Sequence, residues 1–411
     1  MPDASTSVPA PIDPAARVTL LDALRGFALF GVCLGNLLTF SFWGSPGTEG
    51  LAPRHVLPTD HAAEFLIHAL VDGKFYSIFS LLFGLGFALQ LGRRDDQVTA
   101  LSTYRRRLWI LAAIGFVHLL AWFGDILLFY ALMGLVLVRL RDVDDRRLLR
   151  WVVILLALPI LNYLPLLIHP ALSLGTPFFA AAYGVASLVG VDITDPNVLV
   201  HHAVQGGWSG YLRISPVGVF FRYGDLLWMG REFKVLAMFA LGMVIGRHKP
   251  WERLEVHLPL LRRVCAWGIA VGLPACLLLA RRSVGVGADT GEPGLAGVLD
   301  AVLYAVGVAP LALGYAAGFV LLWQRAAWRP RLAVLAPTGR MALTSYLMQT
   351  VIALTLFYGI GFGLGGRVGP SWLVLLAIAI LVLQTLFSRW WLARHRFGPM
   401  EGLWRRWTYR A

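Results

Sequence analysis

About ten apolar stretches succeed one another along the chain, each close to the ~20 residues that a helix needs to cross a bilayer. Hydrophobic residues make up 58% of the 411 residues and charged residues only 14%, well below the roughly 25% of a soluble domain. The sequence therefore predicts an all-α polytopic membrane protein with about ten transmembrane helices. The predicted spans are 19–42, 62–91, 107–123, 125–140, 151–169, 229–246, 263–280, 296–323, 333–357 and 371–392.

The loops between these stretches alternate between arginine-rich and arginine-poor, which predicts the orientation of the chain. Arg105, Arg106 and Arg107 lie in one such loop, and Arg405 and Arg406 follow the last span. Because basic loops stay in the cytoplasm, both termini are expected there, and the net charge of +13 reflects membrane topology rather than nucleic-acid binding. The expected divisions are a disordered cytoplasmic tail at 1–17, a transmembrane domain at 18–393 with an extracytoplasmic connection at 170–228, and a basic cytoplasmic tail at 394–411.

The first apolar stretch carries three polar side chains that are costly in hydrocarbon. Asp22 and Arg25 are three residues apart, so they share a helix face and can pair, and Asn36 returns close to that face. One side of this helix is therefore expected to face protein or water. A snorkelling ion pair at the membrane edge, together with an Asn that bonds a neighbouring helix, would explain the same residues.

Two further spans carry charged residues of both signs. Asp72 and Lys74 lie within the second span, and Lys74 is expected to pair with Asp72 or Asp22, in either a ligand site or an ion pair that fixes packing. Arg231 and Lys234 open the sixth span, where they would bind an anionic group such as phosphate or form a salt-bridge network at the rim.

His118 and Asp125 are placed where they could do chemistry. His118 lies past the middle of the third span, and the chain reverses at Gly124, which brings Asp125 back towards the imidazole. A His oriented by a carboxylate is a common general base. The alternative is a His bonded to a backbone carbonyl and an Asp that only caps its helix.

Two other segments carry polar residues. Arg340 follows a Pro-Thr-Gly helix start and would help that helix N-terminus hold phosphate, with Gln349 further along the same stripe. The connection at 170–228 begins with an apolar, glycine-interrupted part, which predicts an interfacial or re-entrant helix pair rather than a span. Its adjacent His201 and His202 are a weak metal signal, and no metal site is expected.

Several motifs in this order resemble the YeiB-like family of bacterial membrane proteins, known as domain of unknown function 418. They are LDALRGFALFGVCLGN, GKFYSIFSLLFGLG, HLLAWFGDILLFYALMG, GRMALTSYLMQT and GPMEGLWRRWT. The opening motif is also similar to a wider transmembrane acyltransferase superfamily, which includes the lysosomal heparan-glucosaminide N-acetyltransferase and bacterial surface O-acyltransferases. The residues that match its Asp-x-x-Arg-Gly start and downstream Asn are Asp22, Arg25, Gly26 and Asn36.

The second resemblance implies transfer of an acyl group from cytoplasmic acyl-CoA, such as acetyl-CoA, to a hydroxyl or amine of an envelope glycan or lipid. The expected location is the bacterial cytoplasmic (inner) membrane. His118, oriented by Asp125, would be the base, and Asn36 or Tyr130 would stabilise the oxyanion. The other expected site residues are Arg25, Arg340, Lys74 and Asp22 for CoA, and Asp72, Arg231, Lys234 and Gln349 for the acceptor.

Three readings of these residues stay open. In an enzyme, funnels from both sides would meet at His118, with His55 and His61 of the first outer loop as rival bases. A transporter or flippase for a small charged molecule or lipid would have one vestibule lined by Asp72, Lys74 and Arg231, with two alternative gates. A scaffold in envelope assembly would have its polar residues paired around no chamber. Expected partners are membrane lipids and the acceptor, with a homodimer left open and nucleic acid excluded.

Overall fold

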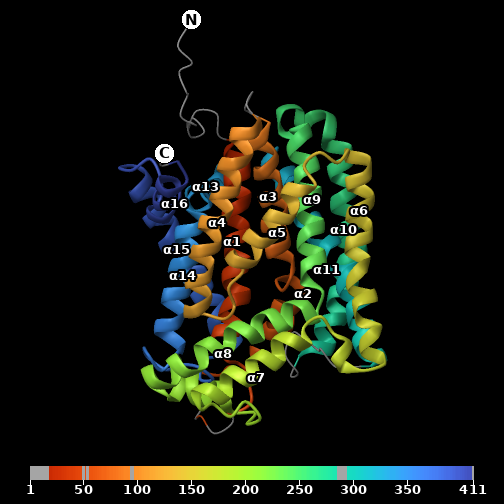
Figure 1. Cartoon of the computed structure of the whole chain (residues 1–411). Coiled ribbons are helices and arrows are strands. Elements are labelled where there is room, and N and C mark those ends of the chain that lie inside the picture. Colours follow the sequence, from red (N-terminus) through yellow and green to blue (C-terminus); the bar gives the residue numbers. More distant parts are fainter. Residues whose placement is uncertain (1–17, 49–50, 52–54, 93–96, 285–293, 410–411) are drawn as a thin grey trace, which may run out of the picture.

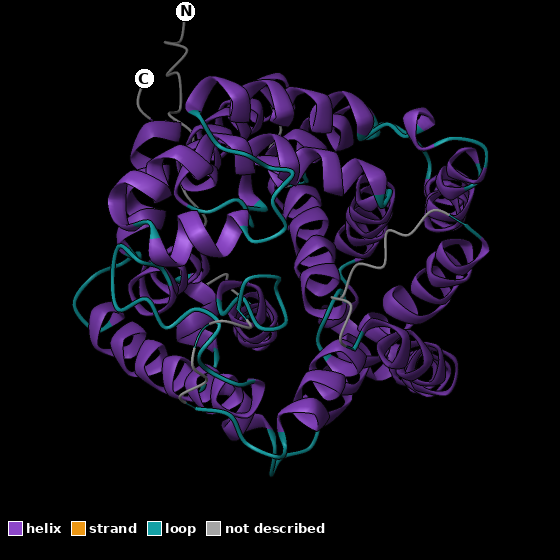
Figure 2. Cartoon of the chain, turned by 90° about the horizontal axis from the view of Figure 1, so that it is seen from below, coloured by secondary structure: helices purple, strands orange, loops and turns teal. Residues whose placement is uncertain are grey.

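The computed structural model describes residues 18–48, 51, 55–92, 97–284 and 294–409, and the predicted tail at 1–17 lies outside them. Figure 2, seen from one end of the bundle, shows helices joined by loops throughout this part of the chain. The longer helices are α1 (Thr19–Phe40), α2 (Asp60–Leu70), α3 (Lys74–Leu91), α4 (Gln97–Ala121), α5 (Leu127–Arg139), α6 (Asp145–Tyr163), α7 (Thr176–Val189), α8 (Gly207–Trp228), α9 (Arg231–His248), α10 (Leu254–Ser283), α11 (Leu295–Trp323), α14 (Ala342–Phe357), α15 (Pro370–Leu392) and α16 (Pro399–Tyr409). Shorter turns are η2 (Pro165–Leu167), η3 (Pro170–Leu172), η4 (Val200–Gln205), η5 (Pro250–Arg253), α12 (Arg329–Ala333) and α13 (Ala336–Arg340).

Six helical segments of the described chain are long and apolar enough to cross a membrane, which confirms an all-α, multi-pass membrane protein. The pair Arg329–Arg340 and Ala342–Phe357 is bent by 79° and makes a seventh such segment if it is counted as one span. The predicted spans at 107–123, 125–140 and 229–246 correspond to α4, α5 and α9. These three helices are not among the segments that are long and apolar enough to cross a membrane. Helices α4 and α9 carry too many charged residues, and α5 has only 13 residues.

Helix α1 runs through the middle of the bundle (Figure 1), packed against α3 and against α13, α14 and α15. Glycines allow these close approaches. A Cβ on Gly31 would overlap the ring of Phe75 in α3, and one on Gly339 in α13 would overlap the backbone oxygen of Asp22. The crossing with α13 therefore brings Arg340 beside the start of α1.

The second long apolar segment is broken at the corner between α2 and α3. Gly73 at this corner has φ of +82°, a backbone conformation that favours glycine. Further along, a Cβ on Gly84 of α3 would overlap the Phe239 carbonyl of α9, so these helices pack backbone to backbone. The break leaves the N-terminus of α3 and the carbonyl groups of the corner beside the interior of the bundle.

The two ends of the bundle differ. Helices α7 and α8, from the connection predicted at 170–228, lie across one end in Figure 1, hereafter the α8 end. The other end, where α1 begins, holds α16 beside α4 and α14, and is hereafter the α16 end. The predicted basic tail at 394–411 thus contains a docked helix that contributes to the interior.

Candidate functional site

A cavity of about 740 Å³ lies inside the bundle and extends between its two ends. Helix α1 contributes a stripe with helical spacing, which confirms that one side of it faces inward: Asp22, Arg25, Leu29, Val32, Asn36 and Thr39. Near the α16 end the polar wall comes from Arg25, Gln90, Arg107, Arg340, Glu401 and Arg405. Near the α8 end it comes from Trp43, Glu64, His68, Asp72, Lys74 and Arg231. The volume falls within the roughly 300–1,000 Å³ of small-molecule sites.

The α16 end of the cavity is rich in arginine. Arg25 Nη1 lies 2.6 Å from Asp22 Oδ1, so the predicted pair is confirmed. Arg107 donates to Gln90 Oε1 at 3.1 Å and stacks on the ring of Trp404 at 4.0 Å. The buried Nε of Arg340 makes no hydrogen bond among the described residues. These guanidinium groups suit the oxygens of phosphate, which arginine binds through fixed N–H donors.

The side chain of Glu401 in α16 caps the N-terminus of α14. Its carboxylate accepts hydrogen bonds from the backbone N–H groups of Leu343 (2.8 Å) and Thr344 (3.0 Å) and from Thr344 Oγ1 (2.6 Å). An acidic side chain at a helix N-terminus satisfies free N–H groups and favours the helix dipole. Burial raises the pKa of Glu401 despite these hydrogen bonds. The helix start predicted to hold phosphate, Pro337–Gly339, belongs to the short helix α13, and the start of α14, which follows it, is already occupied by a carboxylate of the protein itself.

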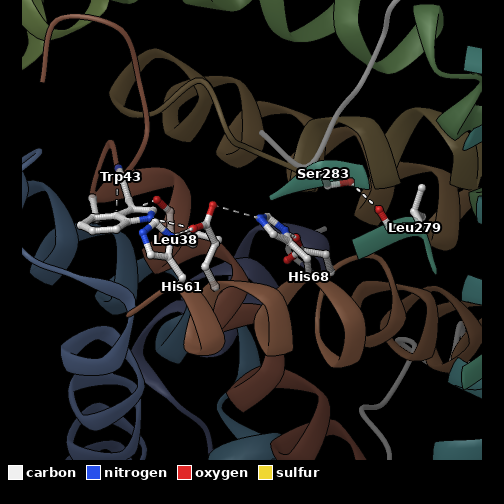
Figure 3. A network of polar contacts seen from close by, with 9 residues as sticks. Leu38, Trp43, His61, His68, Leu279 and Ser283 are labelled. Carbon is white, nitrogen blue, oxygen red and sulfur yellow. Dashed lines mark hydrogen bonds and ion pairs between the residues drawn. The ribbon is translucent and has the colours of Figure 1, made fainter. Parts of the chain in front are cut away.

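A network of polar side chains forms the cavity wall near the α8 end (Figure 3). His68 Nδ1 lies 2.5 Å from Asp72 Oδ2, and His68 Nε2 lies 3.9 Å from Glu64 Oε1. Trp43 Nε1 donates to Glu64 Oε2 at 3.1 Å. Both ring nitrogens of His68 therefore face a carboxylate, and the two contacts hold the imidazole in one orientation on the cavity wall. An imidazole held in this way acts as a general base when its second nitrogen is unprotonated.

The predicted partner of Lys74 is different in the structure. Lys74 Nζ donates to the His68 carbonyl at 2.8 Å, because Asp72 is held by His68 and Asp22 by Arg25. A broken helix exposes carbonyl oxygens, and one of these is the partner that sequence reasoning did not anticipate.

His118 and Asp125 form the predicted pair, with Nδ1 and Oδ1 2.6 Å apart. Both ends of the pair are occupied: His118 Nε2 lies 2.8 Å from Thr350 Oγ1, and Asp125 Oδ2 accepts from Leu128 N at 2.9 Å, which caps α5 as predicted. Neither His118 nor Asp125 is among the described residues that line the cavity. Tyr346 does line the cavity, and its ring lies 5.1 Å from the ring of His118. The pair thus sits one layer behind the wall.

Three other predicted residues have different surroundings. Asn36 lines the cavity. Tyr130 also lines it, but its hydroxyl donates to the Tyr76 carbonyl at 2.7 Å and is therefore committed within the protein. Gln349 donates to Gln384 Oε1 at 3.0 Å, which joins α14 to α15 behind the cavity wall.

The two rival histidines lie towards solvent. His55 is exposed, and its backbone pairs with the chain near Val368. His61 lies 3.7 Å from Glu64, but 84% of its side chain is exposed. Sequence reasoning missed Glu64 and His68, although their spacing with Asp72 was a readable signal. An acid, a His and an acid at successive i, i+4 positions share one helix face.

Comparison with known proteins gives relatives over nearly the whole chain. A family model described as "Protein of unknown function (DUF418)" matches residues 245–411. "Uncharacterized protein YxaH" of Bacillus subtilis is 30% identical over 96% of the chain and 94% of the relative. "Uncharacterized protein YeiB" of Escherichia coli is also 30% identical, over 96% of the chain and 97% of the relative. No solved structure matches the chain.

Proposed function

The chain is a member of the DUF418 family, and we propose that it is a membrane-embedded acyltransferase that moves an acyl group from cytoplasmic acyl-CoA to a hydroxyl or amine of an envelope glycan or lipid. One observation carries the proposal: a single cavity connects arginines at one end with the oriented His68–Asp72 pair near the other. An anionic carrier needs the first, and deprotonation of an acceptor needs the second.

The α16 end is the proposed binding site for acyl-CoA. Arg25, Arg107 and Arg340 would contact its phosphates, and Asp22 would hold Arg25 in place. A Cβ on Gly35 would lie 3.4 Å from Asp72 Oδ1, so Gly35 is the part of α1 that lies beside the His68–Asp72 pair. The separation of Arg25 and Gly35 along α1 therefore gives the distance from the proposed CoA site to the base. Arg25 and Gly35 are ten residues apart, or about 15 Å along a helix. An extended pantetheine arm covers that distance and would bring the thioester towards His68.

The proposed chemistry uses His68 as the base rather than His118, because His68 lines the cavity. In this proposal His68 is neutral, with its proton on Nδ1 towards Asp72 and with Nε2 as the proton acceptor. The acceptor oxygen or nitrogen attacks the thioester carbonyl carbon, and its proton passes to His68 Nε2. The carbon–sulfur bond then breaks, and the proton is returned to the departing CoA thiolate. Asn36 is the proposed oxyanion donor; Tyr130 fits this role less well because its proton is already donated.

We also propose the finer topology that the alternation of arginine predicts. In it, α4, α5 and α9 complete ten crossings, both termini are cytoplasmic, and the protein lies in the bacterial cytoplasmic membrane. The 25 residues of α4 extend about 37 Å, long enough to cross. Helix α1 begins at the same end that holds α16 (Figure 1), as an even number of crossings requires. The α16 end is then cytoplasmic, where acyl-CoA is found.

The test uses the purified full-length protein in lipid nanodiscs. Acetyl-CoA is expected to raise its melting temperature, and an extract of envelope lipids and glycans is expected to drive release of free CoA thiol. The variant His68→Ala should keep the thermal shift and lose thiol release, whereas His61→Ala, at an exposed histidine, should keep both. Absence of a shift with acetyl-CoA and with longer acyl-CoAs would contradict the proposal.

A transporter or flippase is the second candidate, because one cavity is lined by Asp72, Lys74 and Arg231 together. Reconstitution into liposomes separates the two. Transport predicts movement of a small charged molecule or labelled lipid without acyl-CoA, and no release of CoA thiol. The cavity itself disfavours the scaffold reading, which expected the polar residues to close on one another.

A further inference from the structure

An open groove, hereafter the α4–α16 groove, lies on the outside of the bundle between these two helices. It is lined by Arg106, Trp109, Ile110 and Ala113 of α4 and by Trp407 of α16. The α4 residues recur every three or four positions, so they share one face of that helix. Trp109 is 60% exposed and Trp407 is 41% exposed. Among the described residues, none lines both this groove and the interior cavity, so the groove is a separate feature.

The two helices that form the groove are held together on their inner side. Trp404 Nε1 donates a hydrogen bond to the Arg107 carbonyl at 3.0 Å, and the Arg107 guanidinium lies 4.0 Å from the centre of the Trp404 ring. Trp407 follows three residues later on α16 and lines the groove on the outer side of this contact. The groove is therefore formed by the docking of α16 on α4.

The apolar wall of the groove continues along α4 towards the α8 end. Phe116, Val117 and Leu120 are exposed and follow Ala113 at helical spacing. Trp109 and Leu120 are eleven residues apart, which is about 16 Å along a helix. This length is comparable to one leaflet, or half of the ~30 Å hydrocarbon core of a bilayer. An acyl chain that enters the groove can therefore lie against α4 over most of its length.

The rim of the groove nearer the α16 end is basic, with Arg105, Arg106 and Arg406 exposed. Glu401 is the one carboxylate in the sequences of the two helices, and it is bonded to the start of α14. Residues 93–96, which precede α4 in the sequence, carry two charges of each sign and leave this balance unchanged. Arg106 has a further interaction within the protein, and its five N–H donors allow it to bind a phosphate oxygen as well.

We propose that the α4–α16 groove binds an anionic phospholipid. The phosphate lies at Arg106, and one acyl chain runs along Trp109 and Ala113 towards Leu120. Basic side chains at the end of a membrane helix attract anionic headgroups, and tryptophan favours the depth of the headgroups. A zwitterionic lipid would gain the apolar contact with less of the electrostatic one. A lipid bound here contacts both helices, and the proposal does not depend on acyl transfer.

The experiment measures tryptophan fluorescence of the full-length protein in phosphatidylcholine nanodiscs. A small fraction of the lipid is replaced by phosphatidylglycerol with brominated acyl chains or, in the matched arm, by brominated phosphatidylcholine. Bromine quenches tryptophan only at short range. At equal fractions, brominated phosphatidylglycerol should quench more strongly, because the groove concentrates it, and the excess should shrink at high salt. Equal quenching by the two lipids at low salt overturns the proposal.

Tryptophan variants show where the excess quenching arises. The double variant Trp109→Phe and Trp407→Phe should lose most of the excess, because these are the indoles of the groove. Trp372→Phe, at an exposed tryptophan of α15, should keep it. An excess that persists in the folded double variant would place the anionic lipid elsewhere and overturn the proposal.

Arginine variants test the charge. Arg106→Gln should raise about fivefold the fraction of phosphatidylglycerol that gives half of the excess quenching, as loss of one basic residue at a membrane surface predicts. Arg213→Gln, at an exposed arginine of α8, should leave that fraction unchanged. Arg406→Gln is the second probe if Arg106→Gln does not fold, with a smaller rise expected. An unchanged fraction in the folded variants of Arg106 and Arg406 would overturn the proposal.

Discussion

Two histidine–carboxylate pairs with nearly the same geometry lie in this bundle, and their surroundings differ. The distance from Nδ1 to the carboxylate is 2.5 Å for His68–Asp72 and 2.6 Å for His118–Asp125. In the second pair Thr350 occupies the remaining ring nitrogen. In the first pair the remaining nitrogen lies on the wall of a cavity, 3.9 Å from Glu64. The same local pair is therefore enclosed by protein in one place and lines the cavity in the other.

The largest expected effect is on catalysis. His68→Ala should lower the rate of acyl-CoA-dependent thiol release about 100- to 10,000-fold, the usual contribution of a general base. His118→Ala should lower it less than about tenfold, because its imidazole contacts Thr350 and not the cavity. The rates are compared at equal amounts of folded protein. The opposite ranking would show that the sealed pair is the catalytic one.

The next largest effect is on stability, and here His118→Ala should be the more damaging of the two variants. His118→Ala leaves the Asp125 carboxylate and the Thr350 hydroxyl without their buried partner, which is expected to lower the free energy of unfolding by about 1–3 kcal/mol. His68→Ala should cost less, since the cavity can supply water to Asp72. Thermal unfolding of both variants in the same nanodiscs tests this. An equal loss in the two would remove the distinction between an open and a sealed pair.

A third carboxylate extends the comparison to the α16 end. Burial raises the pKa of Glu401, so the folded state binds its proton more readily than the unfolded chain does. The stabilising contribution of Glu401 is therefore present at low pH and is lost as pH rises through its folded-state pKa. The melting temperature of the wild type should fall over that interval relative to Glu401→Gln, which keeps the contacts to α14 without titrating. A difference between the two proteins that does not change with pH would contradict this.

The smallest expected effect comes from Thr350→Val, which removes only the hydroxyl bonded to His118. The loss of this hydrogen bond should lower the free energy of unfolding by about 0.5–1.5 kcal/mol. Thiol release should stay at the wild-type level. A large loss of activity with normal stability would indicate that His118 Nε2 takes part in chemistry.

The sequence predicted the class of fold and several local contacts well. Apolar length and arginine spacing indicated a multi-pass helical protein, and the spacing of Asp22 with Arg25 and the reversal at Gly124 predicted two pairs that the structure confirms. These are local relations within one helix or one turn, for which residue spacing carries the information.

Relations across the bundle were beyond sequence reasoning. Lys74 was expected to pair with an acid, but its partner is a carbonyl released by the break at Gly73. Gln349 was expected to bind a substrate but bonds Gln384 of α15. The C-terminal residues were expected to form a tail, whereas Glu401 docks on the start of α14. Each depends on which helices adjoin, and a lone sequence does not specify that.

The central claim is that one cavity carries acyl-CoA from the arginines of the α16 end to His68. The most direct measurement is a structure of His68→Ala in nanodiscs with acetyl-CoA. The account predicts phosphates beside Arg25 and Arg340 and an acetyl carbon within about 4 Å of the space left by the imidazole. Acetyl-CoA bound outside the cavity, or with its thioester beside His118 and away from residue 68, would contradict it.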